Sequence, residues 1–399
     1  MLGVRKSLAG KRLLAAGACT AVVALALSAC APSSAPKPKP EAEDAVELGI
    51  PDSEYSLDAL IAAAKKEGPL VVIDTTGKIV DMAEAFSEKY GIQATGVKMK
   101  AGEEAEVVIR EGEAGNVKND LILMPDVQTA VADLIPRGYV QSWFPPDMAD
   151  VVPKQFQDPA IVTQETNVWA YNTEVYGDTC PVDNIWQLTE DEWHGRISFE
   201  DPQLKADYPY WFNQMETYGD DLMAKAYEDE YGEPLKTDEA SATAEWVKRL
   251  AQNAPVLTNT DDEAAESVGA PGQEKPFMGF VSTAKFRGIA DAGLKLGTCA
   301  GLEPWVGRAY TKTALIANGT ASPNAAKLFI HYLYTQEGIA PQVEDGKRST
   351  NIEIPMASGE PSGLESVWDQ ILVFDSSTAQ DDFDRVQDWQ DFWRISLGK

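Results

Sequence analysis

Hydrophobic and polar positions follow two alternating periods in the first third of this 399-residue chain. Short runs that are fully apolar or alternating predict strands at residues 70–73, 93–99 and 120–124. Apolar residues spaced three or four apart predict helices at residues 57–64, 79–90, 103–111 and 126–135. Strands and helices that alternate in this way predict a parallel sheet covered by helices.

The loops that follow the predicted strands carry polar residues. In a parallel sheet, ligands bind beyond the carboxyl ends of the strands, where helix N-termini offer unpaired N–H groups. Loops 74–78, 98–103 and 124–126 are therefore expected to face one crevice. Their candidate ligand contacts are Thr75, Thr76, Lys78, Lys100 and Asp126. The alternative is that these residues only cap helices.

An extended segment, residues 161–175, separates this part of the chain from a second part with its own strand and helix signals. It is rich in residues that favour strands, namely Thr163, Thr166, Val168 and Tyr171. Residues 308–317 form a second extended segment, which would return the chain to the first part. We expect both segments to cross between two lobes, with Glu165, Thr166 and Asn167 on the floor of the cleft. A strand that simply exposes polar residues on one face is the alternative.

Beyond residue 175 the pattern predicts more helix than strand. Strands are expected at residues 196–199 and 277–281, and a strand followed by a helix at 256–268. Further helices are expected at 183–194, 211–231, 237–253, 322–337, 364–372 and 383–397. Aromatic clusters usually belong to a core, but Tyr208 and Tyr210 are expected in the loop that starts at Glu200. Because a core explanation is weaker for loop residues, both tyrosines are candidate ligand contacts.

The N-terminus has the pattern of an export signal. Four basic residues precede the apolar run 13–27, which is followed by Ser28, Ala29 and Cys30. The sequence Leu-Ser-Ala-Cys resembles the lipobox of bacterial lipoproteins, which implies lipidation of Cys30 after removal of residues 1–29. A plain secretory signal is the alternative. Residues 30–54, rich in Pro, Ala and charge, are expected to form a flexible tether.

Composition limits the classes of function. A chain of this length with 44% apolar residues can build two or three cores. Loss of residues 1–29 would remove four basic and no acidic residues, which lowers the net charge from −29 to −33. Such an acidic protein is not expected to bind nucleic acid, whose phosphates would repel it.

Two cysteines remain after export and lipidation, Cys180 and Cys299. In an oxidising compartment they could form a disulfide, and two buried free thiols are the alternative. Neither lies in a CxxC motif or beside a histidine, so redox catalysis and zinc binding are not indicated.

A family resemblance rests on six segments in a fixed order: SLDALIAAAKKEGPLVVIDTT, AFSEKYGIQATGV, NDLILMPDVQTAVADLIPRGYVQSW, VWAYNTEV, DEWHGRISFEDP and SPNAAKLFIHYLYTQEG. Over most of residues 56–340 the chain resembles the extracellular solute-binding proteins of ABC importers, in the branch that includes the ferric-iron binders. The resemblance implies an α/β fold of the periplasmic-binding-protein type 2, with two α/β lobes joined by extended crossover strands. The lobes would comprise residues 55–162 plus 305–335, and 163–304 plus 336–399.

The ferric binders place two adjacent tyrosines after the strand that corresponds to residues 277–281, and commonly a histidine in the first loop. Here the region of the tyrosine pair contains Phe280, Ser282 and Thr283 instead, and the first loop, residues 74–78, has no histidine. His194 and His331 lie in contexts where a packed or surface imidazole is expected. We therefore predict no metal site and no cofactor.

The cleft-facing loops instead offer hydroxyl groups and cations, which suit a phosphonate, a phosphate ester or a carboxylate. To the contacts already given, the prediction adds Ser282, Thr283 and Arg308. The absence of GxSxG, HExxH, P-loop and GxGxxG motifs argues against an enzyme. We thus expect a monomeric lipoprotein, anchored on the extracytoplasmic face of the membrane, that delivers a small anionic or polar solute to an ABC permease and ATPase.

Three alternatives remain open at this point. They are a binder of iron or an iron chelate with a non-standard site, a lipoprotein that reports a ligand to a sensor kinase, and an exported hydrolase.

Overall fold

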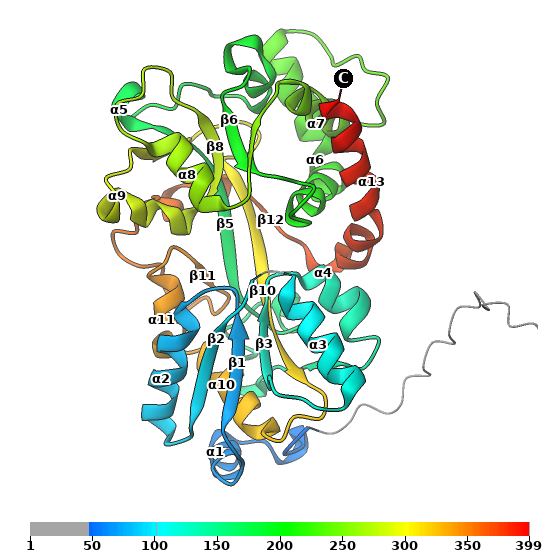
Figure 1. Cartoon of the computed structure of the whole chain (residues 1–399), viewed down its shortest axis with the longest axis vertical. Coiled ribbons are helices and arrows are strands. Elements are labelled where there is room, and N and C mark those ends of the chain that lie inside the picture. Colours follow the sequence, from blue (N-terminus) through cyan, green and yellow to red (C-terminus); the bar gives the residue numbers. More distant parts are fainter. Residues whose placement is uncertain (1–47, 101, 399) are drawn as a thin grey trace, which may run out of the picture. The chain divides into compact units, whose positions relative to one another are not determined.

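The computed structural model describes residues 48–100 and 102–398. The predicted signal peptide, Cys30 and most of the predicted tether lie outside these residues. The strands of the described residues form one twelve-stranded sheet with the order β2-β1-β3-β10-β5-β8-β6-β7, in which β4 and β12 also pair with β10, and β9 and β11 with β5 (Figure 1). The strands are β1 (Leu70–Asp74), β2 (Ala94–Lys98), β3 (Leu121–Met124), β4 (Val140–Ser142), β5 (Ile161–Asn172), β6 (Ile197–Glu200), β7 (Val256–Thr258), β8 (Met278–Ser282), β9 (Leu296–Thr298), β10 (Gly307–Ala317), β11 (Arg348–Ser349) and β12 (Ile371–Val373).

The first lobe is built around β1, β2 and β3, which are parallel to one another. Its helices are α1 (Leu57–Ala64), α2 (Lys78–Tyr90), α3 (Glu103–Ala114), α4 (Val127–Thr129), α10 (Pro323–Leu333) and α11 (Gln336–Val343), and a π-helical turn at 130–134 continues α4. Ser56 Oγ accepts a hydrogen bond from the Ala59 N–H and so caps α1. The apolar face of α2, formed by Ile79, Met82 and Phe86, is buried as its spacing predicts.

The second lobe is built around β6, β7 and β8, which are also parallel. Its helices are α5 (Thr173–Tyr176), α6 (Asp207–Tyr231), α7 (Ala242–Gln252), α8 (Asp261–Gly269), α9 (Gly288–Asp291), α12 (Leu364–Val367) and α13 (Ala379–Leu397). An aromatic cluster fills its core, in which the rings of Trp211 and Phe280 stack with centroids 4.3 Å apart. Trp169 of β5 packs on Phe280 with centroids 5.1 Å apart, which ties the sheet to this core.

Strands β5 and β10 pass through both lobes and pair with each other in antiparallel fashion (Figure 1). Every residue of β5 is buried, and so is every residue of β10 except Tyr310. The two extended crossovers predicted from sequence are therefore confirmed, as is the type 2 periplasmic-binding-protein fold. Because residues opposite each other in an antiparallel pair share a face, Arg308, Tyr310 and Lys312 lie on the same face as their partners, which are Asn167, Glu165 and Thr163.

Some local predictions were wrong. Tyr208 and Tyr210 lie in the first turns of α6 and are buried there, whereas the sequence placed them in a loop. Residues 183–194 form two short 3₁₀ helices, at 185–189 and 191–193. The predicted helix at 364–372 is split, because its end forms β12, whose main chain pairs with β10.

The chain after residue 335 contributes to both cores. Ile339 and Val343 of α11, and Ile354 after it, are buried in the first core, although we expected residues 336–399 in the second lobe. The reason is local, since α11 follows α10 almost directly and packs against α2. Trp389 and Trp393 of α13 do lie in the second core.

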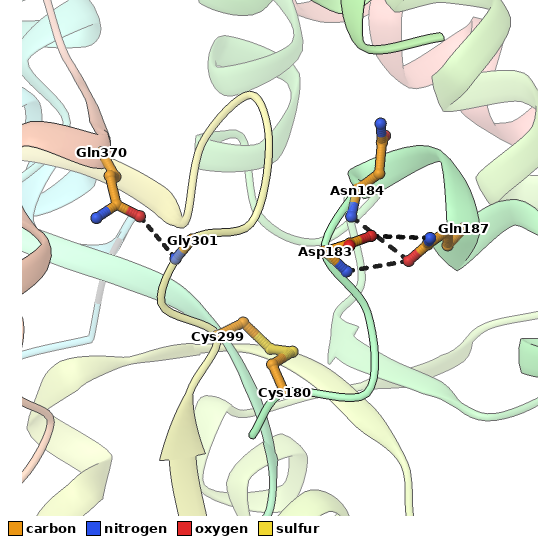
Figure 2. The surroundings of a disulfide bond; sticks show 7 residues. All are labelled: Cys180, Asp183, Asn184, Gln187, Cys299, Gly301 and Gln370. Carbon is orange, nitrogen blue, oxygen red and sulfur yellow. Dashed lines mark hydrogen bonds between the residues drawn. A yellow bond between two sulfur atoms is a disulfide. The ribbon is translucent and has the colours of Figure 1, made fainter. Parts of the chain in front are cut away.

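Cys180 and Cys299 form a disulfide, so the first of the two possibilities left open by the sequence holds (Figure 2). The bond joins the segment after α5 to the segment after β9. Each segment is also held by hydrogen bonds. Gln187 binds the Asp183 main chain and side chain, and the Gly301 N–H donates to Gln370 Oε1.

Candidate functional site

Arg308 of β10 is a buried cation held by aromatic rings. Only 5% of its surface is exposed. The guanidinium carbon lies 5.0 Å from the ring centroid of Tyr310 and 5.7 and 5.9 Å from those of Tyr208 and Trp211. These distances are typical of cation–π contacts, which orient the planar group without using its N–H donors.

The donors of Arg308 are incompletely matched. Nη2 lies 3.0 Å from Asp207 Oδ2, an ion pair at the start of α6. Nε, by contrast, is buried and has no hydrogen-bond partner within the described residues. A buried donor without an acceptor costs about 1–3 kcal/mol, so such atoms call for a partner.

A cavity lies beside Arg308. In this part of β10, residues 307–309 pair with β12 and residues 313–316 pair with β3, so residues 310–312 lie between the two pairings. The cavity has room for about one water molecule, with about 20 Å³ open to the centre of a water. The first lobe contributes Pro125 and Gln128 to its lining. The second lobe contributes Asp207, Tyr210, Trp211, Gln214 and Leu372, and Phe374, which is buried in the first core, also lines the cavity. The cavity is therefore lined by residues of both lobes.

Lys312, four residues along the same face of β10, lies in a saturated network. Its Nζ is 2.7 Å from Asp74 Oδ1 and 2.7 Å from Glu165 Oε1. Lys347 Nζ also lies 2.7 Å from Glu165 Oε1. Gln342 completes the network, because its Nε2 donates to Asp74 Oδ2 over 2.9 Å and its Oε1 accepts from Lys347 over 3.1 Å.

The charges of this network are stabilised by one another. Burial alone would raise the pKa of Glu165, but the ammonium groups of Lys312 and Lys347 lower it below its ordinary value. Burial would likewise lower the pKa of Lys312, and Asp74 and Glu165 raise it above the ordinary value instead. For Lys347, burial is the stronger influence and its pKa is lowered.

Glu104, in the first turn of α3, lies beside this network but does not share its bonds. The residue is 1% exposed, and its Oε1 has no hydrogen-bond partner in the described part of the chain. Burial raises the pKa of Glu104 to about 9, and the nearby carboxylate of Asp74 adds to the effect. Its carboxyl group is therefore neutral at pH 7.

Asp126 connects the two lobes electrostatically. It caps α4, with Oδ1 accepting from the Thr129 N–H over 2.9 Å and Oδ2 from the Thr129 hydroxyl over 2.7 Å. Burial raises its pKa, and the carboxylate of Asp207 in the second lobe raises it further. A hydrogen bond with the Tyr210 side chain acts in the opposite direction and lowers the pKa of Asp126. The charge of Asp126 also raises the pKa of Glu104.

The structure brings five of the sequence-predicted contacts to one region, namely Asp126, Asn167, Tyr208, Tyr210 and Arg308. Others have structural partners. The Thr283 hydroxyl donates to the carbonyl groups of Thr166 and Gly346. Ser282 Oγ accepts from the Ala284 N–H and caps the next turn.

The remaining predicted contacts lie in the loops of the first lobe. Thr75 Oγ1 and the Thr76 N–H both donate to Asp74 Oδ1, so they help to hold the carboxylate that binds Lys312. Thr76 Oγ1 accepts from the Lys78 N–H. Lys100 is exposed. As ligand contacts, all twelve residues stay predictions.

Several residues of the region were not predicted from the sequence: Asp74, Glu104, Asp207, Trp211, Lys312 and Lys347. One signal was present in the sequence. Arg308, Tyr310 and Lys312 are two residues apart in a strand whose end is apolar, so they are expected on one face of that strand.

Within residues 48–100 and 102–398, no group of three or more His, Cys, Asp or Glu side chains is arranged to hold a metal ion. His331 Nε2 lies 3.2 Å from Asp147 Oδ2, and His194 Nδ1 lies 3.3 Å from Asn253 Oδ1. In the same ranges, no helix is long and apolar enough to cross a membrane.

A family model described as bacterial extracellular solute-binding protein matches residues 71–348, which is more than half of the chain. The chain belongs to this family. No curated protein sequence matches this solute-binding protein significantly.

Solved structures share the fold of this solute-binding protein at low sequence identity. The substrate-binding protein of an ABC transporter from Agrobacterium tumefaciens is 15% identical, with a TM-score of 0.62, and the match covers 85% of this chain and 96% of that one. The ferric binding protein from Campylobacter jejuni is 13% identical, with a TM-score of 0.63 and coverages of 82% and 99%. AfuA from Actinobacillus pleuropneumoniae, solved with fructose-6-phosphate, is 19% identical, with a TM-score of 0.60 and coverages of 82% and 99%.

Proposed function

We propose that this solute-binding protein captures a small polar organic anion, such as a carboxylate, a phosphonate or a phosphate ester, between its lobes. It then delivers the anion to the permease and ATPase of an ABC importer. The protein would act as a monomer, held on the extracytoplasmic face of the membrane by lipid on Cys30 and by the tether that follows. No covalent chemistry is involved.

The proposal of an anion rests on the buried guanidinium of Arg308, whose Nε has no hydrogen-bond partner among the described residues and whose Nη2 is paired only with Asp207. A guanidinium group presents its donors as a planar fork that matches the two oxygens of a carboxylate or phosphate group. The aromatic rings fix the fork in place, so little conformational entropy is lost when an anion binds. A neutral solute would gain less from the same buried cation.

Closure follows from the position of the site. Arg308 lies on a strand shared by both lobes, the residues of α6 belong to the second lobe, and Gln128 and Asp126 belong to the first. A solute on Arg308 that contacts both sets of residues favours the closed state by its differential affinity for that state.

Neighbouring folds do not favour one ligand over another, since AfuA was solved with fructose-6-phosphate and another relative is a ferric binding protein. Iron is the weaker proposal for this chain, because the two adjacent tyrosines of the ferric binders are replaced by Phe280, Ser282 and Thr283 and the first loop has no histidine. The sugar phosphate in AfuA is compatible with an anion site, and we propose the broader class.

The test is the effect of Arg308→Lys on the binding of small carboxylates, phosphonates and phosphate esters, measured by thermal shift and calorimetry at low salt. Lysine keeps the charge but not the planar fork, and hydrogen bonds to charged groups contribute about 1.5–3 kcal/mol, so affinity should fall roughly 10- to 150-fold. Arg348→Lys is the matched control, because Arg348 also lies over an aromatic ring, that of Trp368, 4.3 Å from its guanidinium carbon. Binding of neutral solutes alone would refute the proposal.

A further inference from the structure

The last helix of the chain, α13, contacts both lobes. Trp389 and Trp393 are buried in the core of the second lobe, whereas Ala379, the first residue of the helix, is buried in the core of the first lobe. The helix also packs against α4 of the first lobe (Figure 1). It therefore connects the lobes at a place other than the crossover strands.

Asp382, in the first turn of α13, accepts hydrogen bonds from both lobes. One carboxylate oxygen, Oδ2, accepts from Gln214 Nε2 of α6 over 2.7 Å and from Gln128 Nε2 of α4 over 3.4 Å. The other oxygen, Oδ1, accepts from Asn213 Nδ2 of α6 over 2.7 Å. The residue has no exposed surface. A single buried oxygen is thus bonded to one amide group of each lobe.

The carboxyl group of Asp382 is ionised at neutral pH. Burial raises its pKa to about 6, and the hydrogen bonds from Asn213, Gln214 and Gln128 act in the opposite direction. Hydrogen bonds to a charged acceptor are roughly twice as strong as those between neutral groups. Because α13 packs along α6 and α7, separation of the lobes should break the long bond to Gln128 and keep the two bonds within the second lobe.

Gln128 and Gln214 both line the cavity beside Arg308, one from each lobe, whereas Asp382 does not. Since their amide nitrogens bind Asp382, the carboxylate sets the orientation of one polar side chain in each wall of the cavity. A site keeps its geometry when such supporting hydrogen bonds lock its side chains. Asp382 therefore acts on the site through Gln128 and Gln214 and not by contact with a solute.

We propose that Asp382 is a positioning residue that stabilises the closed state by holding Gln128 and Gln214 on one carboxylate oxygen. The bond to Gln128 forms only when the lobes meet, so it slows the release of a solute and leaves the rate of encounter unchanged. The effect on release rests on the proposed function, but closure itself can be measured without a solute.

The first experiment measures closure in the full chain at pH 7.5 with no solute added. Spin labels on Lys65→Cys and Lys236→Cys, at exposed positions of the first and second lobes, report the distance between the lobes by pulsed electron paramagnetic resonance. Gln128→Leu and Asp382→Ala should each shift the distribution towards longer distances. If Asp382→Ala does not fold, Gln128→Leu tests the same bond from the other side.

Asp381→Ala is the matched control. Asp381 is the neighbouring carboxylate on α13 and accepts from Asn213 over 2.9 Å, but in the described chain it accepts from no side chain of the first lobe. Its replacement should leave the distances between the lobes unchanged.

The second experiment measures solute kinetics by stopped flow, with succinate, ethylphosphonate and fructose-6-phosphate as probes. Gln128→Leu should raise the dissociation rate constant roughly three- to tenfold and change the association rate constant less than about twofold. In the Asp382→Ala background, Gln128→Leu should have no further effect. A direct contact between Gln128 and the probe would give the same loss in both backgrounds.

The outcomes separate this inference from the proposed function. Unchanged distances in Gln128→Leu, an equal shift in Asp381→Ala, or a full effect of Gln128→Leu in the Asp382→Ala background overturns the role of Asp382 and leaves the anion proposal intact. If none of the three probes binds to the wild type, the proposed function is contradicted for these classes of anion, and the distances alone decide whether Asp382 stabilises closure.

Discussion

Arg308 and Lys312 are two buried cations on the same face of β10, four residues apart, yet their surroundings differ in kind. Lys312 has two carboxylates at 2.7 Å and no exposed surface. Arg308 has one carboxylate, three aromatic rings and one buried nitrogen, Nε, without a hydrogen-bond acceptor in the described chain. We infer that Lys312, which is fully paired with carboxylates, stabilises the fold, whereas Arg308, which keeps a buried donor without an acceptor, is available to a ligand.

The largest effect is expected for Lys312→Met. Asp74 and Glu165 would lose their shared cation while remaining buried, and breaking a buried pair in this way costs about 3–5 kcal/mol. Urea unfolding should show this loss of stability. Lys236→Met is the control, because the Lys236 side chain is 84% exposed and pairs only at 3.7 Å. A loss below about 1 kcal/mol for Lys312→Met would contradict the structural role.

A pH-dependent effect is expected at Glu104. Its pKa in the folded protein, about 9, lies above the ordinary value of 4.5, so the folded state binds this proton more tightly than the unfolded state does. The contribution of Glu104 to stability should therefore be most favourable below pH 4.5 and should decrease as the pH rises towards 9.

Glu104→Gln keeps a neutral side chain of the same shape and should lack this part of the pH dependence. Urea unfolding at pH 5, 7 and 8.5 should show a variant that is more stable than the wild type at pH 8.5 and similar to it at pH 5. Equal slopes for the two proteins would mean that Glu104 is not buried in the neutral form.

The smallest effect on stability is expected for Arg308→Met, although its effect on binding should be large. Methionine keeps contact with the aromatic rings, and Asp207 is partly exposed, so it can be solvated when its partner is removed. We expect a loss of about 1–2 kcal/mol from the missing cation–π contacts. Anion binding should be abolished in the same variant. A loss of stability as large as that of Lys312→Met would remove the distinction between the two cations.

Much of the fold could be predicted because its signals are local. The apolar face of α2, the fully apolar strand β1 and the extended segments β5 and β10 each depend on residues close together in the sequence. The errors occurred where tertiary contacts override local pattern. Residues 371–373 form a strand because β10 offers an open edge, which is invisible in the segment itself.

The site was less predictable for the same reason. Arg308 could be proposed from its place in a return strand, but the state of Lys312 depends on Asp74, which is 238 residues away. The burial of Glu104 could not be read from α3, whose first turn carries acidic residues typical of an exposed helix start. Partners that are distant in sequence decide which polar residues are saturated and which are not.

The disulfide between Cys180 and Cys299 has a mechanical consequence. It closes a covalent ring that spans a sequence separation of 119 and contains α6, α7, α8 and the strands β6 to β9. A pulling force applied between the two ends of the chain cannot extend this ring, which hides roughly 400 Å of contour length. Single-molecule stretching should recover that length only after a reductant is added, so most of the second lobe stays looped even when the rest of the protein has been drawn out.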